Sequence, residues 1–311
     1  MENLMEYITP PHLVRGDTIG LIAPSSPLQP GRIEKGTRYL EQKGFKIKLG
    51  KHLNDAERFL AGKDEDRAAD IMNFFLDTEV KAIMATAGGY GSQRLLPLLD
   101  FDIIRKHPKI LTGFSDTTAL QLGLLKKAGL ISYSGFTFRD TDVPEVNSLL
   151  DKSLTACLKG EALKVEGGIP VKPGIAKGPL IGGNLECIVA LMGTPYQPDF
   201  KDSIILIEDV FAEPFQTDCR LSQLYLAGVF NQVAGVIFGT FEQCIARHNP
   251  ERDGTIDDVI TEWSSRMSVP CLKNFPYGHI EKRCVLPIGG SIELDADNGC
   301  VTLANYGSGD S

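Results

Sequence analysis

Short apolar runs alternate with segments of helical character over the first 136 residues of the chain. The apolar runs have the length of strands and lie at 18–24, 45–49, 81–86, 109–114 and 131–134. The segments predicted as helices are 31–43, 64–76, a stretch that ends at Leu99 and a stretch that begins at Asp116. Apolar strands that alternate with helices are typical of a parallel sheet covered on both faces. The sequence therefore predicts an α/β domain in the N-terminal half.

The alternation breaks after about residue 136, where the composition also changes. Residues 147–159 look helical, and residues 160–177 are rich in Gly, Pro and Lys. We therefore predict an N-terminal domain of residues 1–140, a linker of residues 141–175 and a C-terminal domain of residues 176–311.

The C-terminal half is predicted to continue with strands and helices. Its strands are expected at 203–207 and 233–241, and its helices at 186–192, 215–230 and 256–267. Two last strands, near 285–294 and 300–304, flank a turn and are predicted to form a hairpin.

Composition limits the classes of function that need to be considered. The formal net charge of −8 argues against a nucleic-acid or anionic-membrane surface, and no apolar stretch is long enough to span a bilayer. The acidic start of the chain, residues 1–6, does not resemble a secretory signal. Seven scattered cysteines without a C-x-x-C pair favour reduced thiols over a disulfide framework or a zinc site. We therefore expect a cytoplasmic protein.

The stretch from Lys109 to Leu120, KILTGFSDTTAL, joins an apolar strand to a helix without a linker. Such a junction needs a sharp turn, and Ser115 stands on it, against the N–H groups and the positive dipole end of the helix. This is the geometry of a nucleophile elbow, although the G-x-S-x-G pattern is absent. The alternative is that Ser115 or Asp116 simply caps the helix.

A second turn with chemical potential follows the third strand. Gly88 and Gly89 leave backbone amides there without shielding side chains, and such amides can receive an oxyanion. The alternative is an ordinary glycine-rich turn. The pattern matches neither a P-loop nor a dinucleotide-binding fingerprint.

A carboxylate and a histidine could complete a catalytic group. Glu208 ends an apolar strand, where it either is solvated or orients a neighbour, and Asp209 should face the opposite side of that strand. Glu213 is a second candidate that fits the start of the next helix better.

His279 follows Gly278, which can aim the imidazole; the alternative is a partly buried structural histidine. The loop and lead-in histidines are expected at the surface; they are His12, His107 and His248. The order Ser115, Glu208, His279 is that of the nucleophile, acid and base in α/β-hydrolases.

Several motifs in a fixed order resemble the LD-carboxypeptidases, the cytoplasmic serine peptidases of murein recycling. The resemblance covers roughly residues 15–295 and rests on the segments 22–25, 88–91, 113–116, 182–185, 193–195, 206–209 and 275–279. It implies an α/β N-terminal domain with the nucleophilic serine, a β-rich C-terminal domain with the Glu and the His, and an active site between them. Carried onto this sequence, these residues are Ser115, Glu208 and His279.

The resemblance also implies the remaining parts of the site. The oxyanion hole would be formed by the N–H groups of Gly89 and Asp116, with Gly88 and Asn184 lining the substrate site and Arg139 as a weaker candidate. No metal or organic cofactor is expected. The substrate would be a murein tetrapeptide, cleaved between the L-centre of a diamino acid and the terminal D-Ala, and the protein is expected to be a homodimer.

Two departures from the family pattern stand near the site. Many members have Arg directly before Gly-Gly-Tyr-Gly, where this chain has Ala87. A usual Asp/Glu-Arg pair in the helix after the catalytic Glu appears as Asp218-Cys219, with Arg220 one place later. Either departure could change substrate preference.

Three further functions are compatible with the sequence. The microcin-immunity branch of the same family cleaves peptidyl or aminoacyl adenylates and carries a longer segment between the serine and the glutamate, whereas these residues are 93 positions apart here. The second function is that of an esterase on an α/β-hydrolase fold, and the third is that of a non-catalytic murein-peptide binder.

Overall fold

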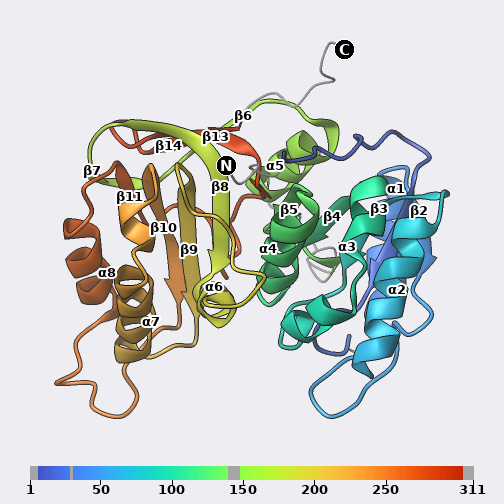
Figure 1. Cartoon of the computed structure of the whole chain (residues 1–311), viewed down its shortest axis with the longest axis horizontal. Coiled ribbons are helices and arrows are strands. Elements are labelled where there is room, and N and C mark those ends of the chain that lie inside the picture. Colours follow the sequence, from blue (N-terminus) through green and yellow to red (C-terminus); the bar gives the residue numbers. More distant parts are fainter. Residues whose placement is uncertain (1–5, 29–30, 139–147, 304–311) are drawn as a thin grey trace.

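Two α/β domains, each built on its own sheet, lie side by side in the computed structural model of the protein (Figure 1). The structure describes residues 6–28, 31–138 and 148–303. Among these residues, no helix combines the length and the apolar character that a bilayer span requires.

The first sheet has six strands in the order β12-β5-β4-β3-β1-β2, and all but β12 are parallel. Its parallel strands are β1 (Thr18–Ile22), β2 (Lys46–Leu49), β3 (Val80–Ala85), β4 (Ile110–Gly113) and β5 (Ser132–Ser134). Its helices are α1 (Arg32–Gln42), α2 (Asp64–Leu76), α3 (Phe101–Lys106) and α4 (Thr117–Ala128). The predicted parallel α/β domain is confirmed. The helix predicted to end at Leu99 is a 3-10 helix, η1 (Ser92–Leu98), with Pro97 inside it.

The second sheet has eight strands in the order β6-β14-β13-β8-β9-β10-β11-β7. Its strands are β6 (Leu163–Glu166), β7 (Ile169–Lys172), β8 (Ile175–Asn184), β9 (Ile204–Val210), β10 (Gly235–Glu242), β11 (Cys271–Lys273), β13 (Ser291–Asp295) and β14 (Cys300–Leu303). Its helices are α6 (Leu185–Leu191), α7 (Pro214–Leu226), η3 (Val229–Asn231) and α8 (Ile256–Ser265). Strands β8 to β11 are parallel, and the others are antiparallel.

The range 141–175, predicted as a linker, contains regular structure. It includes α5 (Ser148–Lys159), which agrees with the helix predicted at 147–159. It also includes β6 and β7, which form the opposite edges of the second sheet. Gly and Pro, which made this range look like a linker, are tolerated at sheet edges, where one side of the strand needs no partner. The limits 1–140 and 176–311 stay a prediction.

The predicted strand 285–294 is in fact two strands in different sheets. Strand β12 (Leu286–Ile288) pairs antiparallel with β5 in the first sheet, whereas β13 pairs with β8 in the second. The chain changes direction at Gly289, whose φ of +88° is readily adopted only without a side chain. The hairpin of β13 and β14 is confirmed. Because of β12, the C-terminal half of the chain completes the N-terminal sheet.

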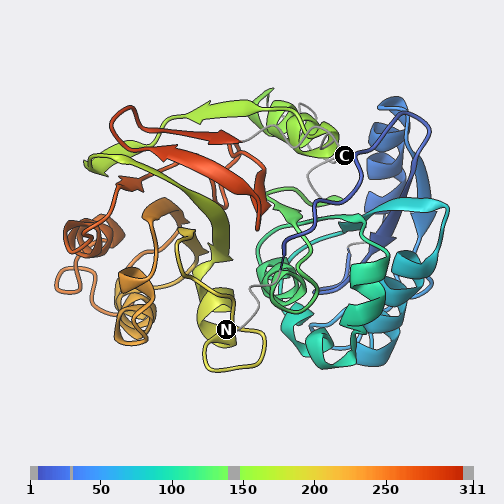
Figure 2. The same cartoon turned by 45° about the horizontal axis from the view of Figure 1, so that its top comes forward.

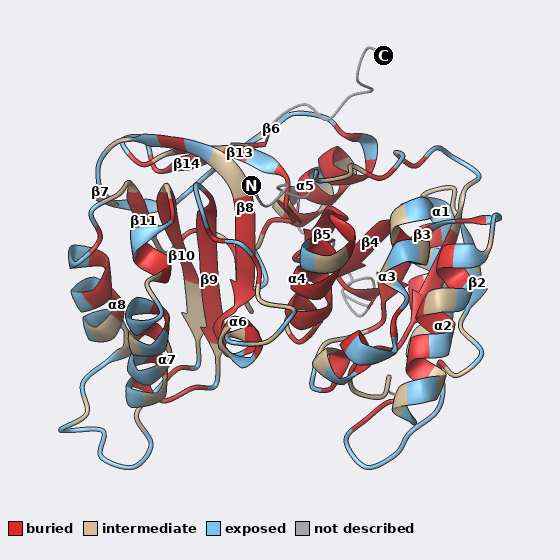
Figure 3. Ribbon diagram, in the orientation of Figure 1, coloured by how far each residue is buried: buried red, intermediate tan, exposed pale blue. Residues whose placement is uncertain are grey.

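Helix α4 lies between the two sheets in both views of the ribbon (Figures 1 and 2). Nearly all of its residues are buried, as the red colour in Figure 3 shows. Strand β8 can approach it closely because Gly183 has no side chain: a Cβ there would lie 2.6 Å from Oγ1 of Thr118 on α4. The backbone N–H of Asn184 donates to the same hydroxyl at 3.1 Å. This contact sets the end of β8 against the start of α4.

Candidate active site

Ser115 stands on the sharp turn between β4 and α4. Its φ of +62° lies in the left-handed region, which costs a residue with a side chain about 1–2 kcal/mol. The N–H of Thr118 donates to the Ser115 carbonyl at 2.9 Å, so the first turn of α4 starts directly at the serine. The junction therefore has the strained strand-to-helix geometry of a nucleophile elbow.

The side chain of Asp116 does not cap α4, although the residue occupies the capping position. Its Oδ2 accepts hydrogen bonds from Oγ of Ser25 at 2.6 Å and from the N–H of Ser92 at 2.8 Å. Its Oδ1 accepts from the N–H of Gly91 at 3.2 Å. The carboxylate thus joins the elbow to two other segments, and a simple helix cap does not describe this stretch.

The structure brings Ser115, His279 and Glu208 into one hydrogen-bonded series. Nε2 of His279 lies 3.0 Å from Oγ of Ser115, and Nδ1 lies 2.7 Å from Oε2 of Glu208. Glu208 is fully buried, whereas 22% of the His279 side chain is exposed. The imidazole therefore has one nitrogen on a buried carboxylate and the other on a hydroxyl. Such an arrangement can deprotonate the serine and stabilise the imidazolium that forms.

Asn184, predicted to line the substrate site, is buried and fully engaged inside the protein. Its Nδ2 donates to Oε1 of Glu208 at 3.2 Å and to Oδ1 of Asp209 at 3.3 Å, while its Oδ1 accepts from the N–H of Cys187 at 3.3 Å. Through these contacts the side chain orients Glu208 and caps α6, and its role in lining the substrate site stays a prediction.

The buried Asp209, next to Glu208 in the chain, belongs to a second cluster of charged side chains. Its Oδ2 accepts from Nη1 of Arg220 at 2.8 Å, and Nη2 of Arg220 lies 3.2 Å from Oε2 of Glu186. Burial raises the pKa of Asp209 to about 6, and the Arg220 guanidinium opposes that rise. The arginine displaced by one position in the sequence therefore still reaches a carboxylate beside the site.

Aromatic packing holds His279 on the other side. Its ring lies 4.6 Å from the ring of Phe114, which precedes the serine. The neighbouring Tyr277 is fully buried, and its hydroxyl lies 2.7 Å from Oγ of Ser134 at the end of β5. The loop that carries the histidine is thus anchored to the first domain.

The turn that follows β3 lies directly against the serine. A Cβ on Gly88 would lie 2.8 Å from Cβ of Ser115 and 3.1 Å from its Oγ, so only glycine fits without movement. Within the described residues, the N–H groups of Gly89 and Asp116 donate to no protein acceptor. Free N–H groups beside a nucleophile are what an oxyanion requires.

The remaining predicted candidates lie elsewhere. Glu213 is the capping residue of α7, as expected, and its carboxylate accepts from the N–H groups of Arg247 and His248. His248 and His107 are exposed, whereas His12 is only partly exposed. Arg139 lies outside the described residues.

Sequence reasoning missed the roles of Ser25 and Ser92, which both bond to Asp116. Ser25 follows β1 and lies within the family motif of residues 22–25. Its position at the carboxyl end of a parallel strand was the available signal.

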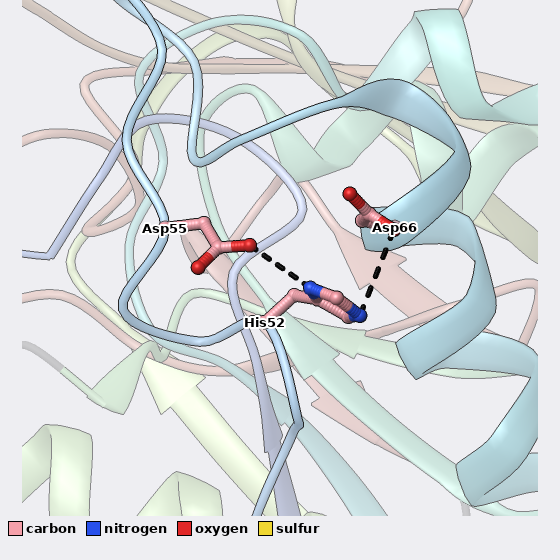
Figure 4. Close-up of side chains that lie close together, drawn as sticks. All are labelled: His52, Asp55 and Asp66. Carbon is pink, nitrogen blue, oxygen red and sulfur yellow. Dashed lines mark hydrogen bonds and ion pairs between the residues drawn. The ribbon is translucent and has the colours of Figure 1, made fainter.

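One group of metal-ligating residue types lies together in the part of the chain that the structure describes: His52, Asp55 and Asp66 (Figure 4). Nδ1 of His52 lies 2.9 Å from Asp55, and Nε2 lies 3.6 Å from Asp66. Figure 4 shows the imidazole between the two carboxylates, each nitrogen facing a different acid. This arrangement suits an ion-pair cluster that ties the loop to α2 more than ligands converging on one ion.

A serine, a histidine and a buried carboxylate in series on an α/β fold are the arrangement of the serine hydrolases. Two family models match the chain: the LD-carboxypeptidase N-terminal domain over residues 19–135 and the LD-carboxypeptidase C-terminal domain over residues 177–294. The chain belongs to the LD-carboxypeptidase family, and it is a serine carboxypeptidase.

Individual relatives agree with this assignment. The chain is 34% identical to a probable murein peptide carboxypeptidase of Bacillus subtilis, over 92% of this chain and 91% of the relative. A structure of MccF in complex with glutamyl sulfamoyl guanosine matches with a TM-score of 0.87 at 26% identity, over 96% and 99% of the two chains. A muramoyltetrapeptide carboxypeptidase from Oxalobacter formigenes matches with a TM-score of 0.84 at 25% identity, over 94% and 100%.

Proposed function

We propose that this protein is a cytoplasmic LD-carboxypeptidase that removes the terminal D-Ala from murein tetrapeptides during peptidoglycan recycling. The observation that carries the proposal is the series Ser115–His279–Glu208, in a chain similar to a protein named as a probable murein peptide carboxypeptidase. The cleaved bond would join the L-centre of a diamino acid to the D-Ala.

In the first half of the reaction, Oγ of Ser115 attacks the carbonyl carbon of the scissile bond. Nε2 of His279, 3.0 Å away, takes the hydroxyl proton as the general base. Glu208 accepts from Nδ1 of the same ring and stabilises its positive charge. The tetrahedral oxyanion is stabilised by the N–H groups of Gly89 and Asp116.

In the second half, the imidazolium of His279 gives its proton to the leaving nitrogen, and D-Ala departs. Water then attacks the acyl group on Ser115 with His279 again as the base, which releases the tripeptide and restores the hydroxyl. Glu208 can orient the imidazole in both halves, because its carboxylate is buried and held in place by Asn184.

A second candidate function is hydrolysis of peptidyl or aminoacyl adenylates. The observation that favours it is the similarity to MccF, which has the slightly higher TM-score of the two structures compared. The shorter separation of Ser115 and Glu208 favours the murein substrate, since the longer segment expected of the immunity branch is missing.

The test is mass spectrometry of the purified protein incubated with murein tetrapeptide, beside Ser115→Ala. Loss of one alanine by the wild type alone would support the proposal and the nucleophile together. An intact tetrapeptide in both reactions would refute the proposed substrate, and aminoacyl adenylates would then be tested. Light scattering during gel filtration would test the expected homodimer.

A further inference from the structure

The two proposed oxyanion donors come from segments that are far apart in the chain. Gly89 belongs to the turn after β3, whereas Asp116 belongs to the elbow after β4. A hydrogen-bond donor stabilises an oxyanion only when it is held at about 2.7–3.1 Å from it, and small misplacements are costly. Something must therefore keep the turn in register with the elbow.

The side chain of Asp116 makes this connection directly. Only 6% of the residue is exposed, and its carboxylate accepts three hydrogen bonds: from the Ser25 hydroxyl after β1 and from the N–H groups of Gly91 and Ser92 at the end of the turn. The hydroxyl of Ser92 donates in return to the Asp116 carbonyl at 2.6 Å. Hydrogen bonds to an ionised carboxylate are roughly twice as strong as those between neutral groups.

The segment after β1 holds the other end of the turn. The N–H of Ser26 donates to the Gly88 carbonyl at 3.3 Å, and Oγ of Ser26 accepts from the N–H of Tyr90 at 3.3 Å. Arg67 on α2 donates to the carbonyls of Pro24 and Gly91. The loop that presents Gly89 is thus fixed on both sides of the glycine, and Asp116 is the group that ties it to the nucleophile.

We propose that the carboxylate of Asp116 is a positioning group of the oxyanion site. It sets the Gly88–Ser92 turn against the elbow, so that the N–H of Gly89 and its own backbone N–H face the same oxygen. The inference rests on the proposed role of Ser115 as the nucleophile, but not on the identity of the substrate. It also gives the motif of residues 22–25 a function, because Ser25 supplies one of the three donors.

The test is Asp116→Asn, which preserves size but replaces one acceptor oxygen with a donor NH₂. In either orientation the NH₂ faces a backbone N–H, that of Gly91 or that of Ser92, so two donors oppose each other and one hydrogen bond is lost. The turn should shift, and kcat for the tetrapeptide should fall by about 10²-fold, the lower end of the loss of one oxyanion donor, with KM changing less than about threefold. Ser25→Ala, which removes one donor only, should give a smaller loss of the same kind.

A substrate-independent readout separates this inference from the proposed function. The rate at which a fluorophosphonate labels Ser115 also depends on the oxyanion donors, and it should fall with kcat in Asp116→Asn. The matched control is Asp100→Asn, in which the carboxylate lost is an exposed cap that accepts from the N–H of Ile103 at 3.0 Å. This control should label at the wild-type rate.

The labelling and turnover results together test the proposed substrate and the positioning role of Asp116 separately. A wild type that is labelled but releases no alanine refutes the substrate alone, and the labelling ratio still tests Asp116. Equal labelling of the wild type and Asp116→Asn, or a loss confined to KM, overturns the positioning role. If Asp116→Asn does not fold, Ser25→Ala decides, since wild-type labelling in that variant would contradict the inference. A wild type that is never labelled at Ser115 overturns both proposals.

Discussion

Replacing Ser115 by glycine should make the protein more stable than replacing it by alanine, although both variants lose the nucleophile. The two variants lack the same hydroxyl and the same hydrogen bond to His279, so their difference isolates the Cβ atom. Ser115 has a φ of +62°, where a Cβ atom crowds the backbone. The strain of the elbow can therefore be measured as a difference in the free energy of unfolding.

The magnitude follows from two opposing effects. The left-handed backbone costs a residue with a Cβ about 1–2 kcal/mol. Glycine lowers the free energy of unfolding by about 0.4–1 kcal/mol relative to alanine, because the unfolded chain with glycine has more conformational entropy. The expected net advantage of Ser115→Gly over Ser115→Ala is therefore about 0.8 kcal/mol from the middle of both ranges, with an upper limit of about 1.6 kcal/mol. With an unfolding entropy of about 2.1 cal/mol/K per residue, this is a difference of about 1 °C in Tm for a chain of this length.

Differential scanning calorimetry and urea titration of the two variants would measure this difference. The control is Ser265, an exposed residue at the end of α8, where glycine should instead be less stable than alanine by up to about 1 kcal/mol. The same sign at both positions, or Ser115→Gly equal to or below Ser115→Ala, would refute the idea that the elbow is strained.

Three further predictions concern the groups around the serine. His279→Ala should lose nearly all turnover, because the general base is removed, and Glu208→Gln should lose about 10²–10⁴-fold in kcat, because the base loses its carboxylate partner. The circular dichroism spectrum of both variants should be unchanged. Alanine release would be measured by chromatography, and retained activity in His279→Ala would show that another residue is the base. Gly88→Ala should reduce kcat at least about tenfold, because the new Cβ would lie 2.8 Å from the Cβ of Ser115. Full activity in the same assay would show that the turn moves enough to accommodate the Cβ. Burial raises the pKa of Asp209 to about 6, whereas its value in the unfolded chain is about 3.9. Between these two values the folded protein holds this proton and the unfolded chain does not. The contribution of Asp209 to stability should therefore fall by about 3 kcal/mol as the pH rises from about 4 to 6. The urea midpoint of unfolding, measured at about pH 4.5 and 7, should fall less in Asp209→Asn than in the wild type. An equal pH dependence in the variant and the wild type would contradict the raised pKa.

Local features of the chain were predictable because they depend on local rules. Strand-length apolar runs and helical spacing predicted the parallel sheet, and α2 has the predicted bounds of Asp64–Leu76. The strand-to-helix junction at Ser115 followed from the absence of a linker between an apolar run and a helix start. The strand predicted at 285–294 was wrong as one element, because the pattern does not say which sheet an apolar segment joins.

The sequence by itself determined the alternating elements of the N-terminal half, the sharp turn under Ser115 and the short set of residue types able to act there. Only the tertiary structure decided which of them meet. His279 and Ser115 are 164 positions apart, and Ser25 and Asp116 are 91 apart. The first contact is set by how the two sheets pack around α4, and the second by the order of the strands in the first sheet. No periodicity encodes either of them. For the same reason Asn184 proved to be an internal partner of Glu208, and Asp116 proved to join three segments rather than to cap its own helix.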